Sequence, residues 1–502
     1  MVTSKHIVLF GAGKSASVLI EYLKQISLEN DWLVTVADSN LKATKKKVGE
    51  HTHTRALQVN IEDESQRRQL VQQADIVISL LPPALHYYVA LDCLAFNKHL
   101  LTASYIDEKI KALAETIKNK GLLFLCEMGL DPGIDHMSAM QLLHRIKARG
   151  GKVTSFLSHC GGLVAPESDD NPWHYKISWN PRNVVLAGKA GAVFKQKGQE
   201  VHIHYEQLFI NNPAVYVPGL EPLAYYSNRD SLSYATLYGI EGADTFIRTT
   251  LRHPEFCTGW KNIVDLKLTD EEKVYETDGM TVADFFKIHF EKHGFATWLN
   301  DLLNSRLSYA KEMMEKLLQL MEAEEQGDDE DDIEDQFMMV NEKGTLDVIN
   351  VEDVKDKAAE TVASTMHEAN TSMKQLFFLG LDDEQKINKG LCSAADILQF
   401  IIEQKWLLLP YDKDMVVMMH EIEYEIGEEE HAVKSSLIVK GEDDILTAMA
   451  KTVGLPLGIA AKLILEGKIQ ETGLHIPIVS SIYEPVLDEL KKHGVRFEEE
   501  ER

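Results

Sequence analysis

The chain has 502 residues, of which 44% are hydrophobic; 52 are Lys or Arg and 79 are Asp or Glu, which gives a formal net charge of −27. This length exceeds what one hydrophobic core usually organises, so the sequence predicts two or three domains. The lack of a long apolar run, noted below, predicts a soluble, cytoplasmic protein. The acidic excess disfavours nucleic acid and anionic membranes as partners, because both attract a basic surface. No apolar run approaches the roughly 18 residues of a membrane span, and no group of Cys, His and carboxylate residues has metal-ligand spacing, so we predict no metal.

The first predicted element is a short buried strand, His6–Phe10, which leads through a glycine-rich turn into a helix. The turn has the pattern G-x-G-x-x-A and comprises Gly11, Ala12, Gly13, Lys14, Ser15 and Ala16. Gly11 permits the tight turn, Gly13 lets a pyrophosphate approach the backbone, and Ala16 lets the helix pack on the strand. We therefore predict that these six residues bind a dinucleotide at the helix N-terminus.

The second predicted strand, Leu33–Ala37, ends at Asp38, which lies 22 residues beyond Ala16. A carboxylate at this place accepts hydrogen bonds from the adenosine ribose hydroxyls and repels a 2′-phosphate. The sequence therefore favours NAD over NADP. Lys42 and Lys45–Lys47 follow closely and weaken that preference, so NADP stays the alternative.

Four further apolar runs are expected to complete a doubly wound parallel sheet in an α/β domain. They are Ala56–Ile61, Asp75–Pro83, His99–Tyr105 and Leu122–Asp131. Ligands of such sheets bind outside the carboxyl ends of the strands. The predicted crevice is lined by Gly11–Gly13, Asp38, Leu81–Pro83, Ser104–Tyr105 and Gly129–Asp131.

The rest of the chain changes character twice. Gly151–Phe256 reads as a mixed sheet, and the pattern becomes helical from Val282–Phe290 onward. The acidic run Glu322–Gln336 is predicted to be a solvated loop, because it has too little apolar surface to bury. Met419–Ile426 alternates like a strand that rejoins the middle domain, and Tyr483–Val495 is an amphipathic helix expected to dock on another domain.

Several long segments resemble the glutamate-forming saccharopine dehydrogenases, also called saccharopine reductases. They include "VISLLPPALH", "LLTASYID", "GLDPGIDHM", "YSNRDS", "IRTTLRHPEF" and, near the end of the chain, "TAMAKTVGLPLGIAAKLILEGKI". The resemblance implies an oxidoreductase of lysine metabolism, which oxidises saccharopine with NAD(P) and water to L-glutamate and L-2-aminoadipate 6-semialdehyde, or the reverse. It also implies a homodimer.

The resemblance further implies a Rossmann-type domain, a mixed α/β substrate domain and a helical domain. With the patterns above, it places the Rossmann domain at 1–135, the mixed domain at 136–270 and 413–502, and the helical domain at 271–412. One departure concerns the cofactor, since Ala37 and Asp38 stand where fungal members have a Cys-Arg pair.

The candidate site residues follow from the resemblance and from the crevice. Matching positions imply substrate contacts at Ser104, Tyr105, Asp131, Arg229, Thr250, Leu251 and Arg252. Further cofactor contacts are predicted at Leu81, Pro82 and Leu130 along the crevice, and at Cys160, Gly161 and Gly162 in the stretch that closes over the cofactor in the family.

Saccharopine is a secondary amine with three carboxylates, so its site needs both cations and a proton acceptor. Arginine matches a carboxylate with two parallel hydrogen bonds. Of the three nearby arginines we expect Arg229 to bind the substrate most firmly, and we expect Arg248 to be the one that lies on a solvated face, pointing away from Arg252.

Asp131 and Tyr105 are the predicted catalytic residues. Asp131 is expected to orient the substrate ammonium and relay protons, while Tyr105 donates to a carboxylate or to the developing carbinolamine. Asp135 and His136 are alternatives, although Asp135 is more readily explained as a helix cap and His136 as a packed residue. Two rival readings stay open: a related carbon–nitrogen reductive enzyme, such as a carboxynorspermidine or homospermidine synthase, and a non-catalytic NAD-binding sensor.

Overall fold

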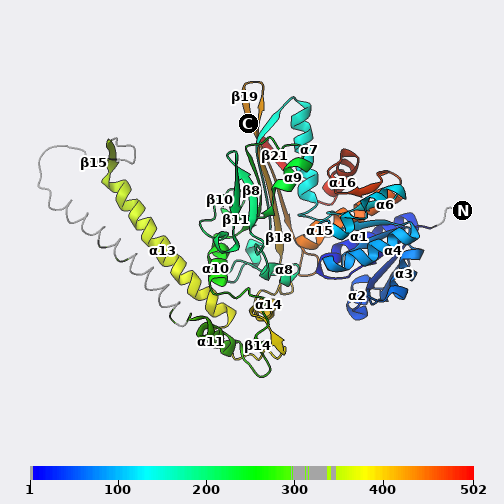
Figure 1. The fold of residues 1–502 in the computed structure, drawn as a ribbon, viewed down its shortest axis with the longest axis horizontal. Coiled ribbons are helices and arrows are strands. Elements are labelled where there is room, and N and C mark those ends of the chain that lie inside the picture. Colours follow the sequence, from blue (N-terminus) through cyan, green and yellow to red (C-terminus); the bar gives the residue numbers. More distant parts are fainter. Residues whose placement is uncertain (1–3, 296, 298–310, 312–314, 316–335, 341–345) are drawn as a thin grey trace, which may run out of the picture. The chain divides into compact units, whose positions relative to one another are not determined.

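The computed structural model describes the chain except residues 1–3, 296, 298–310, 312–314, 316–335 and 341–345 (Figure 1). The predicted acidic loop Glu322–Gln336 lies outside the described residues, apart from Gln336 itself. The chain divides into two compact units, Met1–Pro254 with Trp406–Arg502, and Glu255–Lys405. The three-domain division with boundaries at 135, 270 and 412 stays a prediction.

A seven-stranded parallel sheet in the first unit confirms the predicted doubly wound fold. Its strand order is β20-β6-β5-β4-β1-β2-β3. The strands are β1 (His6–Phe10), β2 (Leu33–Asp38), β3 (Thr54–Gln58), β4 (Ile76–Ser79), β5 (His99–Thr102), β6 (Leu123–Leu125) and β20 (Gly473–His475). The first six correspond to the six predicted strands, whereas β20 comes from the C-terminal part of the chain and pairs with β6.

Helices bury both faces of this sheet. They are α1 (Ser17–Asn30), α2 (Leu41–Val48), α3 (Glu64–Gln73), α4 (His86–Phe96), α5 (Glu108–Lys111) and α6 (Ala114–Asn119), with short 3₁₀ turns η1 (Lys14–Ala16) and η2 (Pro83–Leu85). Alternate residues of β1 enter different cores: Leu9 packs with Leu19 of α1, and Phe10 packs with Val89 of α4. A continuous apolar strand is what a sheet covered on both faces requires.

The C-terminal helices complete the core on one side of the sheet. They are α15 (Ala448–Leu465) and α16 (Ser480–Lys492). Gly454 and Gly458 bring α15 against α1, since an added Cβ would lie 2.9 Å from Leu19 and 2.6 Å from Tyr22. The helix α15 is long and apolar enough to cross a membrane by composition, but 72% of it is buried inside the protein.

The second sheet of the same unit is mixed and has ten strands. Its main path is β10-β11-β13-β7-β18-β19-β21, and β8, β9 and β12 join it at the side. The strands are β7 (Lys152–Val164), β8 (Ala192–Gln196), β9 (Gln199–Ile203), β10 (Ala214–Val215), β11 (Leu223–Ser227), β12 (Arg229–Asp230), β13 (Thr245–Arg252), β18 (Asp414–Ile426), β19 (Glu429–Lys440) and β21 (Glu498–Glu501). The predicted returning strand is the second half of β18, which pairs with β7.

Three helices accompany the mixed sheet: α7 (Ile134–Ala148), α8 (Pro181–Val185) and α9 (Leu232–Leu237), along with 3₁₀ turns η3 (Pro166–Ser168) and η4 (Tyr205–Gln207). The apolar side of α7, with Met137 and Met140, shares a core with Phe156 of β7 and Met418 of β18. Because α7 follows β6 directly, it connects the carboxyl edge of the parallel sheet to the mixed sheet.

The second unit contains most of α10 (Pro254–Asp265), then α11 (Val282–His293), β14 (Tyr275–Glu276), β15 (Gln336–Val340), β16 (Leu346–Asn350), α13 (Val351–Leu379), β17 (Leu391–Cys392) and α14 (Ala394–Lys405). Its buried side chains include Trp260, Phe285, Leu376 and Ile397. A full capping box at Thr281 and Asp284 starts α11, where the sequence predicted helical structure.

Candidate functional site

The glycine-rich turn after β1 has the geometry of a pyrophosphate site. Gly11 has φ +99°, and an added Cβ would lie 2.6 Å from the carbonyl oxygen of Leu80. At Gly13, by contrast, the Cβ direction is open to 4 Å. No side chain caps η1 or α1, and Ala16 N–H and Ser17 N–H donate to Gly13 O and Lys14 O, so the positive end of the helix backbone begins within this turn. The chain at residues 11–16 therefore fits a dinucleotide.

Asp38 lies at the end of β2, as predicted, but its carboxylate is bound to the protein. Its Oδ2 accepts a hydrogen bond from Ala12 N–H at 2.8 Å, and its Oδ1 accepts one from Asn40 N–H at 2.8 Å. Lys47 of α2 reaches the same place and donates to the carbonyl oxygen of Gly13 at 2.5 Å. Burial lowers the pKa of the Lys47 ammonium, whereas the charge of Asp38 raises it. Asp38 is thus accompanied by a cation.

The segment Gly129–Asp135 closes on itself at the carboxyl end of the sheet. Gly129 N–H donates to Pro132 O at 2.9 Å, and Ile134 N–H donates to Gly129 O at 2.9 Å. Gly133 has φ +147°, and an added Cβ would lie 2.1 Å from the oxygen of Gly129, so no larger residue fits. This turn ends the strand region, starts α7 and presents Asp131.

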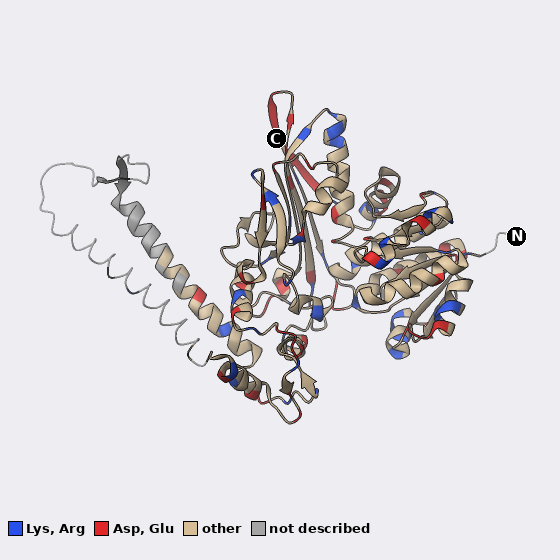
Figure 2. Ribbon diagram, viewed as in Figure 1, with Lys and Arg blue, Asp and Glu red and all other residues tan. Residues whose placement is uncertain are grey.

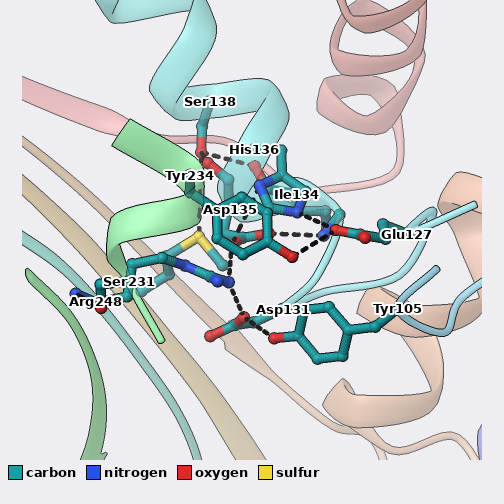
Figure 3. Close-up of polar contacts among 12 residues, drawn as sticks. Tyr105, Glu127, Asp131, Ile134, Asp135, His136, Ser138, Ser231, Tyr234 and Arg248 are labelled. Atoms are coloured by element: carbon teal, nitrogen blue, oxygen red, sulfur yellow. Dashed lines mark hydrogen bonds and ion pairs between the residues drawn. The ribbon is translucent and has the colours of Figure 1, made fainter. Parts of the chain in front are cut away.

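Asp131 contacts the predicted site residue Tyr105 and also Arg248, an arginine expected to lie elsewhere (Figure 3). Its Oδ1 accepts from Tyr105 Oη at 3.3 Å and from Arg248 Nη2 at 2.6 Å. The side chain of Asp131 is 14% exposed and that of Arg248 is 5% exposed. Burial raises the pKa of the Asp131 carboxyl, and so does the charge of Asp135, while Arg248 opposes both.

The prediction that Arg248 lies on a solvated face is wrong. Side chains alternate along a strand, so Arg248, Thr250 and Arg252 of β13 share one side of the sheet. Arg248 therefore points into the site. Its guanidinium also lies over the ring of Tyr234, 4.4 Å from the ring centroid.

Asp135 takes part in the same cluster. Arg248 Nη2 donates to its Oδ2 at 2.8 Å, and Gly133 N–H donates to its Oδ1 at 2.6 Å. It is the second residue of α7, whose N-cap is Gly133, so it serves the helix end and the ion pair together. Burial raises the pKa of the Asp135 carboxyl, but His136 and Arg248 outweigh this effect and the net shift is downward.

A second buried carboxylate, Glu127, was not among the predicted site residues. It accepts from His136 Nε2 at 2.9 Å and from Tyr234 Oη at 3.1 Å (Figure 3). The other ring nitrogen of His136 pairs with Tyr238 Oη at 2.5 Å. Glu127 has φ +57°, which is uncommon for a residue other than glycine and which its sequence does not reveal. Its position just beyond a strand end was the available signal.

The remaining predicted substrate residues are distributed around this cluster. Arg229 is exposed and lies over the ring of Tyr105, 5.4 Å from its centroid. Arg252 lies over the ring of Tyr175 at 5.1 Å. Ser104 Oγ pairs with His86 Nε2 at 2.9 Å.

Thr250 and Leu251, two predicted substrate contacts on β13, point to opposite sides of the sheet. Thr250 shares the side of Arg248, whereas the side chain of Leu251 is buried in the cluster of Leu163 and Val417 on the opposite side of the sheet. The Leu251 side chain therefore points away from Arg248. Its carbonyl oxygen accepts a hydrogen bond from Arg252 Nη1 at 2.7 Å.

The Cys160–Gly162 segment lies in β7, where Cys160 is paired in register with Thr250. Burial raises the pKa of the Cys160 thiol well above its usual value. An added Cβ would lie 2.7 Å from Leu251 at Gly161 and 2.5 Å from Met449 at Gly162. The close approach at these glycines is therefore made by the protein itself, and their contact with a cofactor stays a prediction.

The predicted cofactor residues Leu81, Pro82 and Leu130 follow β4 and β6, at the same edge of the parallel sheet as the glycine-rich turn. Leu130 is buried and Pro82 is exposed. Among the residues that the structure describes, no group of three or more His, Cys, Asp or Glu side chains is arranged to hold a metal ion.

Two family models match the chain. The saccharopine dehydrogenase NADP binding domain matches residues 7–125, and the saccharopine dehydrogenase C-terminal domain matches residues 129–495. The chain is 31% identical to the saccharopine dehydrogenase [NADP(+), L-glutamate-forming] of Saccharomyces cerevisiae over 500 residues, with 99% of each chain covered. A solved structure of saccharopine dehydrogenase (L-Glu forming) from the same yeast covers 99% of this chain and all of that one, with a TM-score of 0.76 and 26% identity.

Longer relatives match as well. The chain is 31% identical to the mitochondrial α-aminoadipic semialdehyde synthase of Bos taurus over 502 aligned residues, and the alignment covers 99% of this chain. It spans only 48% of that relative, and 41% of the α-aminoadipic semialdehyde synthase of Arabidopsis thaliana, to which it is 32% identical. The chain thus spans less than half of these curated relatives.

The comparisons overturn the predicted preference for NAD. The model that matches the first domain describes an NADP binding domain, and the relatives from Saccharomyces cerevisiae and Pyricularia oryzae are named as NADP(+) enzymes. The prediction gave the charge of Asp38 more weight than that of the lysines that follow it, Lys42 and Lys45–Lys47. The carboxylate of Asp38 is held by two backbone N–H groups and faced by Lys47, which reduces its repulsion of a 2′-phosphate.

The motifs that resemble the saccharopine dehydrogenases lie within the residues that the two family models match. Those residues include the strands of the parallel sheet and of the mixed sheet. The chain belongs to the saccharopine dehydrogenase family.

Proposed function

We propose that this protein is an NADP-dependent oxidoreductase of lysine metabolism, which oxidises saccharopine with water to L-glutamate and L-2-aminoadipate 6-semialdehyde, or catalyses the reverse reaction. One observation carries the proposal. Asp131, a largely buried carboxylate, lies beyond the dinucleotide-binding edge of the sheet and is held by Tyr105 and Arg248. Full-length similarity to L-glutamate-forming dehydrogenases supports the substrate.

The cofactor supplies one part of the chemistry when bound, because its nicotinamide takes the hydride from the carbon beside the substrate amine. The backbone of Gly11–Gly13 and the start of α1 would hold the pyrophosphate. Lys47 would lie toward the adenosine ribose and its 2′-phosphate, since it reaches the end of β2 from α2. Lysine suits a phosphate as a compact point charge.

Asp131 would manage the proton of the substrate amine. The secondary amine must lose a proton before hydride can leave the neighbouring carbon, and the carboxylate of Asp131 would accept it. Its raised pKa, caused by burial and then by Asp135, favours that role. After water adds to the imine, the proton returns to nitrogen as the carbinolamine breaks and glutamate leaves. The balanced reaction releases one proton.

Tyr105 would act as a neutral hydrogen-bond donor. Burial and the charge of Asp131 raise the pKa of its hydroxyl, so the phenol stays protonated at neutral pH. A neutral phenol has a single O–H, which donates to Asp131 in the structure and would turn to the oxygen of the carbinolamine as that intermediate forms, while Asp131 accepts the amine proton. The two side chains are already in contact, with Oη and Oδ1 3.3 Å apart.

The substrate carboxylates need cations that Asp131 does not neutralise. Arg229 and Arg252 would bind them, with Ser104 and Thr250 as hydroxyl partners. Arg229 supports this proposal most directly, because it is exposed and stacks on Tyr105 beside Asp131. The charge of Arg248 is already shared by Asp131 and Asp135, so we assign the substrate carboxylates to the other two arginines.

The assay for the proposal is direct. Purified protein is incubated with saccharopine and NADP⁺, reduced cofactor is followed by absorbance, and glutamate and the semialdehyde are identified by mass spectrometry. Carboxynorspermidine and a homospermidine precursor, supplied with the same cofactor, test the rival reductive enzymes. Turnover of saccharopine alone supports the proposal; turnover of a rival substrate alone, or binding of cofactor without any turnover, contradicts it.

The resemblance also predicts a homodimer, and the sequence itself predicts a cytoplasmic location. Light scattering of the purified chain at several concentrations measures the first, and fractionation of cells that make it measures the second. A monomer at all concentrations, or enrichment in an organelle, would contradict the respective prediction.

A further inference from the structure

Two buried carboxylates share a single nitrogen atom of Arg248. The Nη2 atom donates to Asp131 Oδ1 at 2.6 Å and to Asp135 Oδ2 at 2.8 Å, although a guanidinium offers five N–H donors (Figure 3). The direction of the Arg248 side chain is fixed from both ends. Its backbone N–H donates to Ser231 Oγ at 3.0 Å, and its guanidinium lies on the ring of Tyr234.

Asp135 differs from Asp131 in its access to substrate. Its side chain is 1% exposed, against 14% for Asp131. Gly133 N–H holds its Oδ1, and His136 Nδ1 lies 3.6 Å from its Oδ2. Asp135 therefore faces Arg248 and the interior, and only Asp131 faces the site.

Resting on the proposed function, we propose that Asp135 is a positioning residue that draws Arg248 partly away from Asp131, so that Asp131 remains able to accept a proton. An arginine paired with one carboxylate holds it in the charged form and makes it a weak proton acceptor. An arginine shared between two carboxylates stabilises each less. The buried pair thus secures Arg248 in place without making Asp131 inert.

The other groups around Asp131 do not replace this effect. Tyr105 comes from the loop after β5, Cys160 from β7 and His420 from β18. Tyr234 comes from α9, and Tyr238 directly follows that helix. His136 on α7 favours the charged carboxylate, as Arg248 does, and Glu127 is engaged by His136 and Tyr234. Arg229 stacks on Tyr105. Asp135 is the charged neighbour whose effect on Asp131 opposes that of Arg248.

The experiment follows kcat/KM for saccharopine against pH, whose acid limb reports protonation of the free enzyme. In Asp135→Asn, Arg248 is left to Asp131 alone, so the acid limb should move to lower pH by about one unit or more. The plateau should fall too, because Asp131 becomes a weaker base. Binding of 2′,5′-ADP, which occupies only the adenosine side of the site, should stay unchanged.

Two further variants keep the inference testable if Asp135→Asn does not fold. In Arg248→Gln the two carboxylates repel each other without a shared cation, so the acid limb should move to higher pH. In Arg248→Gln combined with Asp135→Asn, that repulsion disappears and the limb should return downward. The double variant removes one positive and one negative charge, which keeps the buried charge balanced.

The outcomes separate this inference from the proposed function. If wild-type protein does not turn over saccharopine, the proposed function fails and the inference falls with it. If wild-type protein is active, but Asp135→Asn is folded and its acid limb is unshifted, Asp135 only supports the start of α7. If the acid limbs of Arg248→Gln and of the double variant lie at the same pH, Asp135 likewise only supports the start of α7.

Discussion

The two ends of the candidate site are built in different ways. The phosphate turn uses six consecutive residues, Gly11–Ala16, and offers a ligand mainly backbone N–H groups. The acid cluster around Asp131 uses side chains from a loop, two helices and a strand, including Tyr105, Asp135 and Arg248. A local backbone site depends on the conformation of its own residues, whereas an assembled site depends on distant residues arriving together. Changes at the two ends should therefore have different consequences.

The largest expected effect is at the assembled end. Asp131→Asn keeps the shape but removes the proton acceptor, so kcat should fall roughly 10²- to 10⁴-fold, the usual range for general acid–base catalysis. Dissociation constants for 2′,5′-ADP should not change, because the phosphate turn is intact. Turnover close to that of wild-type protein would make Asp131 a residue of the turn only, and His136 would be the next candidate.

The next effect distinguishes two glycines of the phosphate turn. Gly11→Ala forces a Cβ against the carbonyl of Leu80 at a positive φ, so it should lower the melting temperature and abolish binding of NADP⁺. Gly13→Ala is the matched control, since the space at its Cβ is open. It should fold normally but bind the dinucleotide less tightly, because the methyl group occupies the approach of the pyrophosphate. Thermal melting and titration of NADP⁺ by fluorescence measure both, and equal melting temperatures for the two variants would contradict this distinction.

A smaller effect is expected where an exposed side chain meets the substrate. Arg229→Lys keeps the charge but loses the planar fork that matches a carboxylate, so KM for saccharopine should rise about tenfold with a smaller fall in kcat. Initial-rate kinetics at saturating NADP⁺ measure the two constants. A fall in kcat at constant KM would place Arg229 outside the binding of substrate carboxylates.

An effect of similar size tests how the chain accommodates a 2′-phosphate beside Asp38. Lys47→Met should weaken 2′,5′-ADP binding by about tenfold, the equivalent of one charge-assisted hydrogen bond. Lys46→Met is the control, because Lys46 is exposed on the same helix, where Figure 2 shows basic residues gathered. Calorimetric titration with 2′,5′-ADP and with 5′-AMP separates the phosphate from the nucleoside. If Lys47→Met and Lys46→Met lose the same affinity for 2′,5′-ADP, the phosphate is attracted by the general positive charge of the helix and not by a contact with Lys47.

Much of the parallel sheet was predictable, because its signals are local. The apolar run His6–Phe10 is β1 to the residue, and Leu33–Ala37 with Asp38 is β2. The third strand shows the limit, since Ala56–Ile61 was predicted and β3 is Thr54–Gln58. Its alternation is weak and its residues are half-exposed, so pairing with β2 decided the register.

The sequence by itself determined the glycine-rich turn, the presence of the first six strands and the placement of Asp131 at a turn, because glycine patterns, apolar runs and an Asp-Pro-Gly step act over neighbouring residues. Only the tertiary structure decided that β20 joins the sheet, that Asp38 is accompanied by Lys47, and that Arg248 faces Asp131 and Asp135. Each of these depends on contacts between residues far apart in the chain. A three-residue strand and the direction of one arginine leave no periodic signal, and packing against distant elements fixes both.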